Sequence, residues 1–246
     1  LVHSAVESIS KRFDRLVEKG QITEEQSNEN KSRIHGTTDV HELVDCDLII
    51  EAIVEDFDIK SKVLTELCEL APDSIIATNT SSLSVNELAH ATGYAARIVG
   101  MHFFNPAPIM PLVEIVSGTQ SAKSAVIRAT LIAEAWGKTV VQASDTPGFI
   151  VNRVARPYYL ESWRIVEDGL ATVDLVDETL QSLGEFRMGP FMLTDLIGQD
   201  INVATTRSVW NRLGQPSRLA PSAKQESLVE KNNLGRKTGC LSLINI

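Results

Sequence analysis

The stretch DSIIATNTSSLSVNELAHATGYAARIVGMHFFNP, residues 73–106, decides the fold class. It contains an apolar strand over 74–78, an amphipathic helix over 85–91 and a second apolar strand over 97–103. Two strands that are apolar throughout and separated by a helix are typical of a βαβ unit, in which both faces of the sheet are buried. This stretch therefore predicts an α/β domain.

The same alternation extends along the chain in both directions. Further strands are predicted over 47–53, 112–116 and 139–142, with helices before and between them at 1–19, from 23 onward, at 60–70 and at 121–136. After the turn at 145–148 no strand is predicted, and helices cover 149–168, 173–183 and 193–213. We therefore expect a doubly wound, Rossmann-type parallel sheet within residues 1–144 and an all-helical C-terminal domain over 145–246.

Composition excludes several classes of partner. The net charge is −9 and no run of Lys or Arg forms a basic stripe, so we expect neither nucleic acid nor an anionic membrane surface as a partner. No apolar stretch approaches the ~18–20 residues of a membrane span. Cys46, Cys68 and Cys240 share no metal-ligand spacing and are odd in number. We expect no metal site, no disulfide framework and a cytoplasmic setting.

Small polar side chains follow the strand at 74–78 directly, in Thr78-Asn-Thr-Ser-Ser82. They lie at the carboxyl end of that strand, the edge at which open parallel sheets bind ligands. Ser and Thr are also good N-caps, so these residues could instead begin the helix at 85. The residues alone leave both interpretations open.

His102 ends one predicted strand, and Glu114 lies early in the next. The connection between them, residues 105–111, contains three prolines and is predicted to be rigid and neither helix nor central strand. A carboxylate inside an apolar strand is costly unless it is paired. Such a loop could place Glu114 against His102, fix the imidazole tautomer and make His102 a general base. A structural histidine is the alternative.

Three other polar residues are predicted to lie at the same edge of the sheet. Asn152 falls in the first turn of the helix that follows the turn at 145–148, and could point into a cleft. Glu55 and Lys60 come just after the strand at 47–53. For Asn152 an ordinary polar surface residue is the alternative, and for Glu55 and Lys60 it is a solvated helix start.

Three segments together resemble the L-3-hydroxyacyl-CoA dehydrogenase family. They are TNTSSL at 78–83, HFFNPAPIMPLVE at 102–114 and DTPGFIVNR at 145–153, in the family's order and spacing. The second is highly specific and the other two support it, and the similarity runs from the first helix to about Gly239. The resemblance implies NAD-dependent oxidation of L-3-hydroxyacyl-CoA to 3-oxoacyl-CoA, in fatty acid β-oxidation or related acyl-CoA metabolism.

The resemblance also implies roles for single residues. His102 resembles the base that removes the 3-hydroxyl proton as hydride leaves C3 for the nicotinamide, and Glu114 is similar to its partner carboxylate. Ser81 and Asn152 resemble residues that hold the hydroxyl or the developing ketone. The residues that resemble NAD contacts are Glu55, Lys60, Asn79, Ser81, Asn105 and Lys237. Lys19 and Ser81 resemble contacts to the acyl-CoA, whereas Arg12 stands where some members have Ser.

The chain departs from the family pattern at both ends. No G-x-G occurs in the sequence, and the first residue, Leu1, already belongs to an amphipathic helix. We therefore expect the glycine-turn βαβ unit that holds the NAD pyrophosphate to be missing, so that the sheet lacks its first strands and residues 1–246 alone do not turn over substrate. After Gly239 the usual G-x-G-x-Y is replaced by CLSLINI.

Other functions are compatible with parts of this pattern. One is a non-catalytic remnant that binds acyl-CoA or dimerises but cannot hold NAD. Another is a hydroxyacid dehydrogenase that acts on free sugar acids. The sequence Phe-Phe-Asn-Pro after His102 argues against it, because this is the form found in acyl-CoA enzymes. Whichever function holds, the dehydrogenase included, the long amphipathic helices after residue 145 predict a homodimer through the helical domain.

Overall fold

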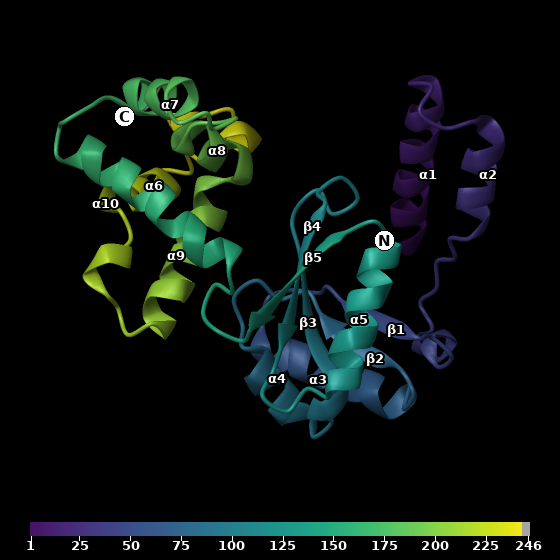
Figure 1. Ribbon diagram of the computed structural model, residues 1–246. Helices are drawn as coiled ribbons and strands as arrows, with labels where there is room; N and C mark the ends of the chain where they lie inside the picture. The colour runs from purple at the N-terminus through teal and green to yellow at the C-terminus, as the bar shows by residue number, and fades with distance from the viewer. Residues whose placement is uncertain (243–246) are drawn as a thin grey trace. The chain divides into compact units, whose positions relative to one another are not determined.

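The computed structural model describes residues 1–242 (Figure 1), so most of the C-terminal departure from the family pattern, residues 243–246, lies outside the described residues. The chain divides into two units, residues 1–47 with 69–74, and residues 48–68 with those from 75 onward. The first unit contains helices α1 (Val2–Glu18) and α2 (Glu24–Ser32) and the short helix η1 (Val40–Leu43). Thr23 caps α2 and exchanges hydrogen bonds with Gln26, which confirms the predicted capping box.

The second unit is built on one five-stranded sheet in the order β1-β2-β3-β4-β5. Its strands are β1 (Leu48–Glu51), β2 (Ile75–Thr78), β3 (Ile98–Phe103), β4 (Leu112–Ser117) and β5 (Thr139–Ser144). Neighbouring strands are parallel as predicted, except that β4 runs antiparallel to β3. Residues 104–111 are too few for a parallel crossover, which needs about a dozen or more residues, so the chain must turn back.

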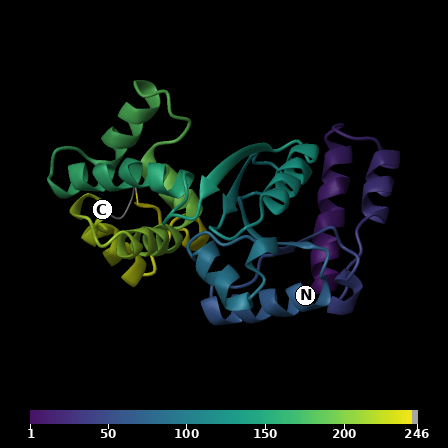
Figure 2. The ribbon, with the colours of Figure 1, turned by 60° about the horizontal axis from the view of Figure 1, so that its bottom comes forward.

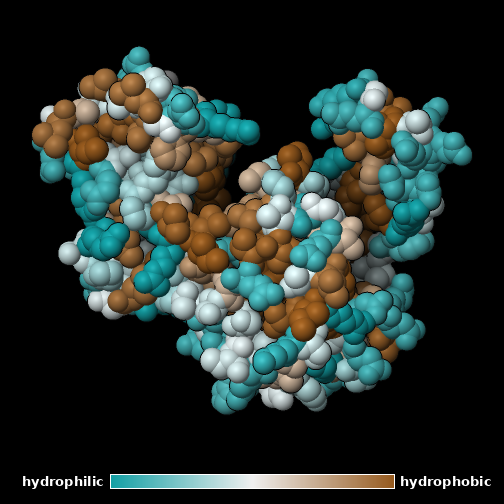
Figure 3. All heavy atoms as spheres, in the orientation of Figure 1, coloured by the Kyte–Doolittle hydropathy of each residue, from teal (hydrophilic) through white to brown (hydrophobic). Residues whose placement is uncertain are grey.

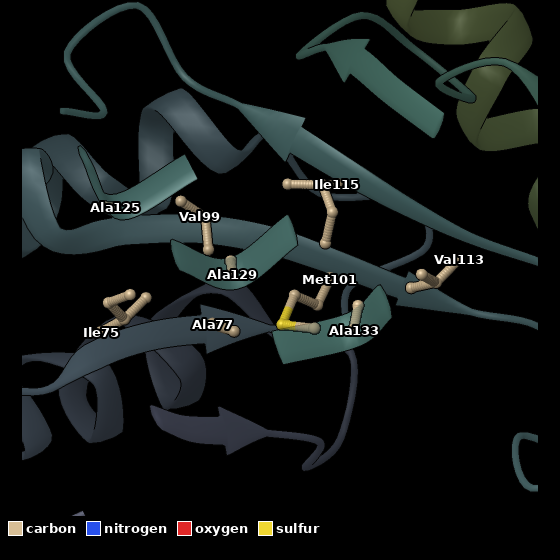
Figure 4. Close-up of a cluster of buried hydrophobic side chains, with 9 residues drawn as sticks. All are labelled: Ile75, Ala77, Val99, Met101, Val113, Ile115, Ala125, Ala129 and Ala133. Atoms are coloured by element: carbon tan, nitrogen blue, oxygen red, sulfur yellow. The ribbon is translucent and has the colours of Figure 1, made fainter. Parts of the chain in front are cut away.

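Helices cover both faces of the sheet (Figure 2), with α5 (Lys123–Ala135) on one side and α3 (Phe57–Leu70) and α4 (Val85–Thr92) on the other. Alternate strand residues such as Val99 and Met101 pack against Ala125, Ala129 and Ala133 of α5 (Figure 4). These alanines lie at i, i+4 and i+8, so they present one smooth face that lets the helix approach the strands closely. The buried, alternating pattern explains why these segments form a layered α/β unit.

After the sheet, the described residues form the helices α6 (Val151–Glu167), α7 (Val173–Ser182), α8 (Pro190–Ile197), α9 (Gln199–Arg212) and α10 (Ala223–Glu230). The prediction of a single helix over 193–213 is wrong, because Gly198 has φ +108° and separates α8 from α9. Similarly, α6 begins at Val151 rather than at Phe149, which has φ +46°. Helix α10 was not predicted. None of the helices described is long and apolar enough to span a membrane.

Candidate active site

The antiparallel pairing of β3 and β4 brings His102 directly opposite Glu114. The imidazole Nδ1 lies 2.6 Å from Oε2 of Glu114. His102 is 5% exposed and Glu114 is fully buried. The predicted pairing of these two side chains is therefore present, and it forms because the proline-containing connection reverses the chain between them.

The second carboxylate oxygen of Glu114 holds the start of helix α6. Oε1 accepts hydrogen bonds from the backbone N–H of Ile150 at 2.9 Å and of Val151 at 3.0 Å. Burial alone would raise the pKa of Glu114, but the hydrogen bonds from His102, Val151 and Ile150 hold it below the usual range. Glu114 is thus an anion that faces both the imidazole and a helix N-terminus, where negative charge is stabilised.

The imidazole of His102 is fixed by two aromatic rings as well as by Glu114. Phe104 and Phe149 meet it edge-on, with ring centroids at 4.7 Å and 5.5 Å. With Glu114 ionised, the proton lies on Nδ1 and Nε2 carries the lone pair. Among residues 1–242 no side chain or backbone group bonds Nε2, so this nitrogen is available to take a proton.

Glu55 organises the loop that follows β2. Its Oε1 accepts from the Thr80 hydroxyl at 2.6 Å, from the backbone N–H of Ser81 and Ser82, both at 2.9 Å, and from the Ser82 hydroxyl at 2.9 Å. Burial would raise the pKa of Glu55, but these hydrogen bonds hold it below its usual value. The interpretation of residues 78–82 as the N-cap of the next helix is wrong, because Ser84 caps α4.

Lys60 lies in the interior, so a solvated helix start is wrong for this residue. It is 1% exposed, and its Nζ donates to Oε1 of Glu51 at 2.7 Å and to the carbonyl of Ile53. Oε2 of Glu51 accepts from the hydroxyl of Thr78. Sequence reasoning missed Glu51, although a glutamate within an apolar strand was a signal that a buried cation pairs with it. Nζ of Lys60 also lies 3.5 Å from Oε2 of Glu55, so Lys60 helps to hold the carboxylate that organises the loop after β2.

The three predicted asparagines differ in their surroundings. Asn79 is joined to both neighbouring strands, because its N–H donates to the Glu51 carbonyl and its Oδ1 accepts from the backbone N–H of Phe103 at 3.1 Å. Asn152 is half-buried in the first turn of α6, next to the residues that bond Glu114. Asn105 is exposed and precedes Pro106 through a cis peptide bond.

Of the three predicted lysines only Lys60 belongs to this cluster. Lys237 lies in the short helix η4 (Arg236–Thr238), is exposed and pairs with Asp200 of α9. Lys19 is the exposed C-cap residue of α1 and belongs to the other unit, as does Arg12. The geometry therefore joins His102, Glu114, Asn79, Ser81, Glu55 and Lys60 at one edge of the sheet, with Asn152 at the start of α6.

Comparison with known proteins yields two family matches. Residues 1–146 match the family model for the 3-hydroxyacyl-CoA dehydrogenase NAD binding domain, and residues 148–241 match that for the 3-hydroxyacyl-CoA dehydrogenase C-terminal domain. The chain belongs to the 3-hydroxyacyl-CoA dehydrogenase family. The predicted resemblance is confirmed, as is the Rossmann-type sheet followed by a helical segment.

Individual 3-hydroxyacyl-CoA dehydrogenase relatives are similar over almost the whole chain. The chain is 43% identical to 3-hydroxyadipyl-CoA dehydrogenase of Escherichia coli K12, over 96% of this chain and 50% of that protein. It is 39% identical to 3-hydroxybutyryl-CoA dehydrogenase of Clostridioides difficile, over 94% of this chain and 82% of that protein. A crystal structure of 3-hydroxybutyryl-CoA dehydrogenase from Escherichia coli K12 superposes with a TM-score of 0.95 at 42% identity, over 98% of this chain and 51% of that one. The chain thus spans about half the length of its relatives from Escherichia coli.

Proposed function

We propose that this protein oxidises L-3-hydroxyacyl-CoA to 3-oxoacyl-CoA with NAD as the hydride acceptor. The observation that carries the proposal is the buried His102–Glu114 pair, which leaves Nε2 of His102 free to accept a proton. In this reaction His102 takes the proton of the substrate 3-hydroxyl at Nε2, and the Glu114 carboxylate stabilises the imidazolium that results. The proline-locked connection and helix α6 hold the pair in place before substrate arrives.

The residues at the carboxyl edge of β1 and β2 fit the nicotinamide half of the cofactor. Asn79 and Ser81 offer an amide and a hydroxyl at the edge where α/β sheets of this type bind dinucleotides. Glu55 and Lys60 set the conformation of the loop that carries Ser81. When bound, NAD supplies the acceptor for the hydride from C3. The proposed contacts of Asn105 and Lys237 rest on the family resemblance.

The substrate hydroxyl is proposed to lie between His102, Ser81 and Asn152. The relatives carry names that specify 3-hydroxyadipyl-CoA and 3-hydroxybutyryl-CoA, so we propose an acyl-CoA substrate and a place in β-oxidation or related acyl-CoA metabolism. Lys19 and Ser81 remain proposed coenzyme A contacts, on the resemblance alone. Cys46, Cys68 and Cys240 form no disulfide in the described part of the chain, which suits a reducing compartment such as the cytoplasm.

The test uses the full-length protein with His102→Gln and, as a matched control, His90→Gln on the exposed face of α4. We expect His102→Gln to lower kcat for 3-hydroxybutyryl-CoA by about 10²–10⁴, the usual range for a positioned acid–base group, with NADH binding retained. His90→Gln is expected to change neither. A His102→Gln variant with wild-type kcat, or a wild-type protein that neither binds NADH nor oxidises the ester, contradicts the proposal. Oxidation of the free hydroxyacid at the same rate as of the ester would favour the hydroxyacid alternative.

We also propose that the domain boundary lies near Asp145 and that the helical segment forms a homodimer. Large apolar side chains are exposed on and beside α7 and α8, namely Leu170, Leu175, Leu183, Phe186 and Leu196. Hydrophobic surface is visible over α7 (Figure 3). Monomeric proteins rarely leave such residues together in water, whereas a two-fold interface would cover them.

A further inference from the structure

Arg156 lies on α6, one helical turn after Asn152, and is 3% exposed. Its Nε donates to the carbonyl of Asn152 at 3.0 Å. Nη1 donates to the carbonyl of Asn202 at 3.2 Å and to the hydroxyl of Thr206 at 2.8 Å, both on α9. The second terminal nitrogen, Nη2, has no hydrogen-bond partner within the described residues.

No carboxylate neutralises this guanidinium in the described part of the chain. The two buried acids of the helical segment are engaged elsewhere. Asp177 accepts from the backbone N–H of Phe191 and Met192, and Asp195 accepts from Gln199 and Ser242. Burial lowers the pKa of Arg156 to about 10, opposed by Tyr159, whose ring lies 4.9 Å from the guanidinium carbon. A buried cation without an anion is costly, and its neighbours are neutral carbonyls, a hydroxyl and a ring.

Arg156 lies on the helix whose first turn is held by Glu114, so its charge could act on a substrate bound at the His102–Glu114 pair. Glu114 bonds the N–H of Val151, Asn152 follows directly, and Arg156 lies four residues further on the same helix face. Four residues correspond to a rise of about 6 Å along α6. In a six-carbon acyl chain with a terminal carboxylate, C6 lies about 4 Å beyond C3 when the chain is extended. A substrate that has its C3 hydroxyl beside His102 and Asn152, and its acyl chain directed along α6, would bring its far end to the guanidinium.

We propose that Arg156 is a specificity-determining residue that binds the terminal carboxylate of a 3-hydroxyacyl-CoA whose acyl chain ends in a carboxyl group. The inference rests on the proposed function and names its substrate class. Guanidinium and carboxylate form short, charge-assisted hydrogen bonds, and these are stronger where water is excluded. An unbranched uncharged acyl chain gains nothing from this site and leaves the cation without an anion.

The first measurement compares two substrates of equal chain length, 3-hydroxyadipyl-CoA and 3-hydroxyhexanoyl-CoA, on the full-length wild-type protein. We expect kcat/KM to be at least tenfold higher for the carboxylated ester, which corresponds to about 1.4 kcal/mol. Equal values, or a preference for 3-hydroxyhexanoyl-CoA, overturn the role of Arg156 and leave the proposed function intact. Turnover of neither ester overturns the proposed function instead. In that case the affinities of the two esters, measured by calorimetry, still test the role of Arg156, since equal affinities overturn that role.

The second measurement uses Arg156→Met and Arg156→Lys, with Arg153→Met as the matched control because Arg153 is exposed on the same helix. We expect Arg156→Met to abolish or reverse the preference while it keeps activity on 3-hydroxyhexanoyl-CoA, and Arg156→Lys to keep part of it. A residue that only ties α6 to α9 would lower activity on both esters by the same factor, and that result overturns the proposal. Arg153→Met is expected to leave the ratio unchanged. If Arg156→Met does not fold, the wild-type preference and the lysine variant carry the test.

Discussion

Glu114 uses one carboxylate oxygen for His102 and the other for the first turn of α6. Glu114→Gln keeps an oxygen that can accept from Ile150 and Val151, but it turns an amide NH₂ toward Nδ1 of His102. The imidazole must then accept at Nδ1 and carry its proton on Nε2, so it cannot act as a base. We expect kcat to fall by about 10²–10⁴ with little loss of stability. NADH formation and urea unfolding measure the two effects, with exposed Glu134→Gln as control; near wild-type kcat would show that Glu114 does not set the tautomer.

Glu55 makes the stability of the loop after β2 dependent on pH. Its folded-state pKa lies below its unfolded value, so its carboxylate contributes stability above the unfolded pKa, roughly 4.3, and that contribution is lost as pH falls through the folded-state value. After allowance for its partial exposure, we expect Glu55→Gln to cost on the order of 1 kcal/mol at neutral pH. Urea titrations at neutral pH and in a series of increasingly acidic buffers should show that this difference shrinks as the pH falls. A difference that stays constant with pH would mean that the charge contributes nothing.

At the scale of elements, the turn that carries Lys237 docks on α8 through Gly235. Gly235 has φ +90°, and a Cβ built there would lie 2.4 Å from the carbonyl oxygen of Asp195, a backbone atom that cannot move alone. We expect Gly235→Ala to lower the free energy of unfolding by about 3 kcal/mol or more. Gly93→Ala is the matched control, because Gly93 also has positive φ but has open space around it, and should cost about 1 kcal/mol. Equal losses for the two variants would show that the contact with α8 is unimportant.

At the scale of the whole molecule, the proposed dimer depends on the apolar surface of the helical segment. Leu183 is 81% exposed beside α7, and a charge at this position would be buried in a two-fold interface. We expect Leu183→Glu to shift sedimentation velocity from dimer to monomer. Leu131→Glu changes an equally apolar residue that is 59% exposed on α5, and should leave the dimer intact. A Leu183→Glu protein that remains dimeric would exclude this surface as the interface.

Local sequence was sufficient for most elements and for the central pair of the site. Apolar runs such as Ile75–Thr78 and Ile98–Phe103 are too short for helices and are rich in β-branched residues, so their length and composition predicted buried strands. Three prolines between His102 and Glu114 leave only a rigid connection, and the short connection then forces the chain to reverse. The pairing of His102 with Glu114 follows from these local constraints together.

Contacts between distant segments decided the rest, because burial and hydrogen-bond partners are not properties of a local pattern. The sequence around Lys60 is compatible with a solvated helix start, but in the fold Lys60 is buried against Glu51, nine residues earlier. Gly198 fits a continuous helical pattern, yet its φ of +108° separates α8 from α9 where residues of the C-terminal turn pack against it. Arg156 looks like an ordinary helix residue in the sequence. Only the fold encloses its charge between α6 and α9, with no carboxylate beside it among residues 1–242, since no local pattern specifies which side chains surround a buried cation.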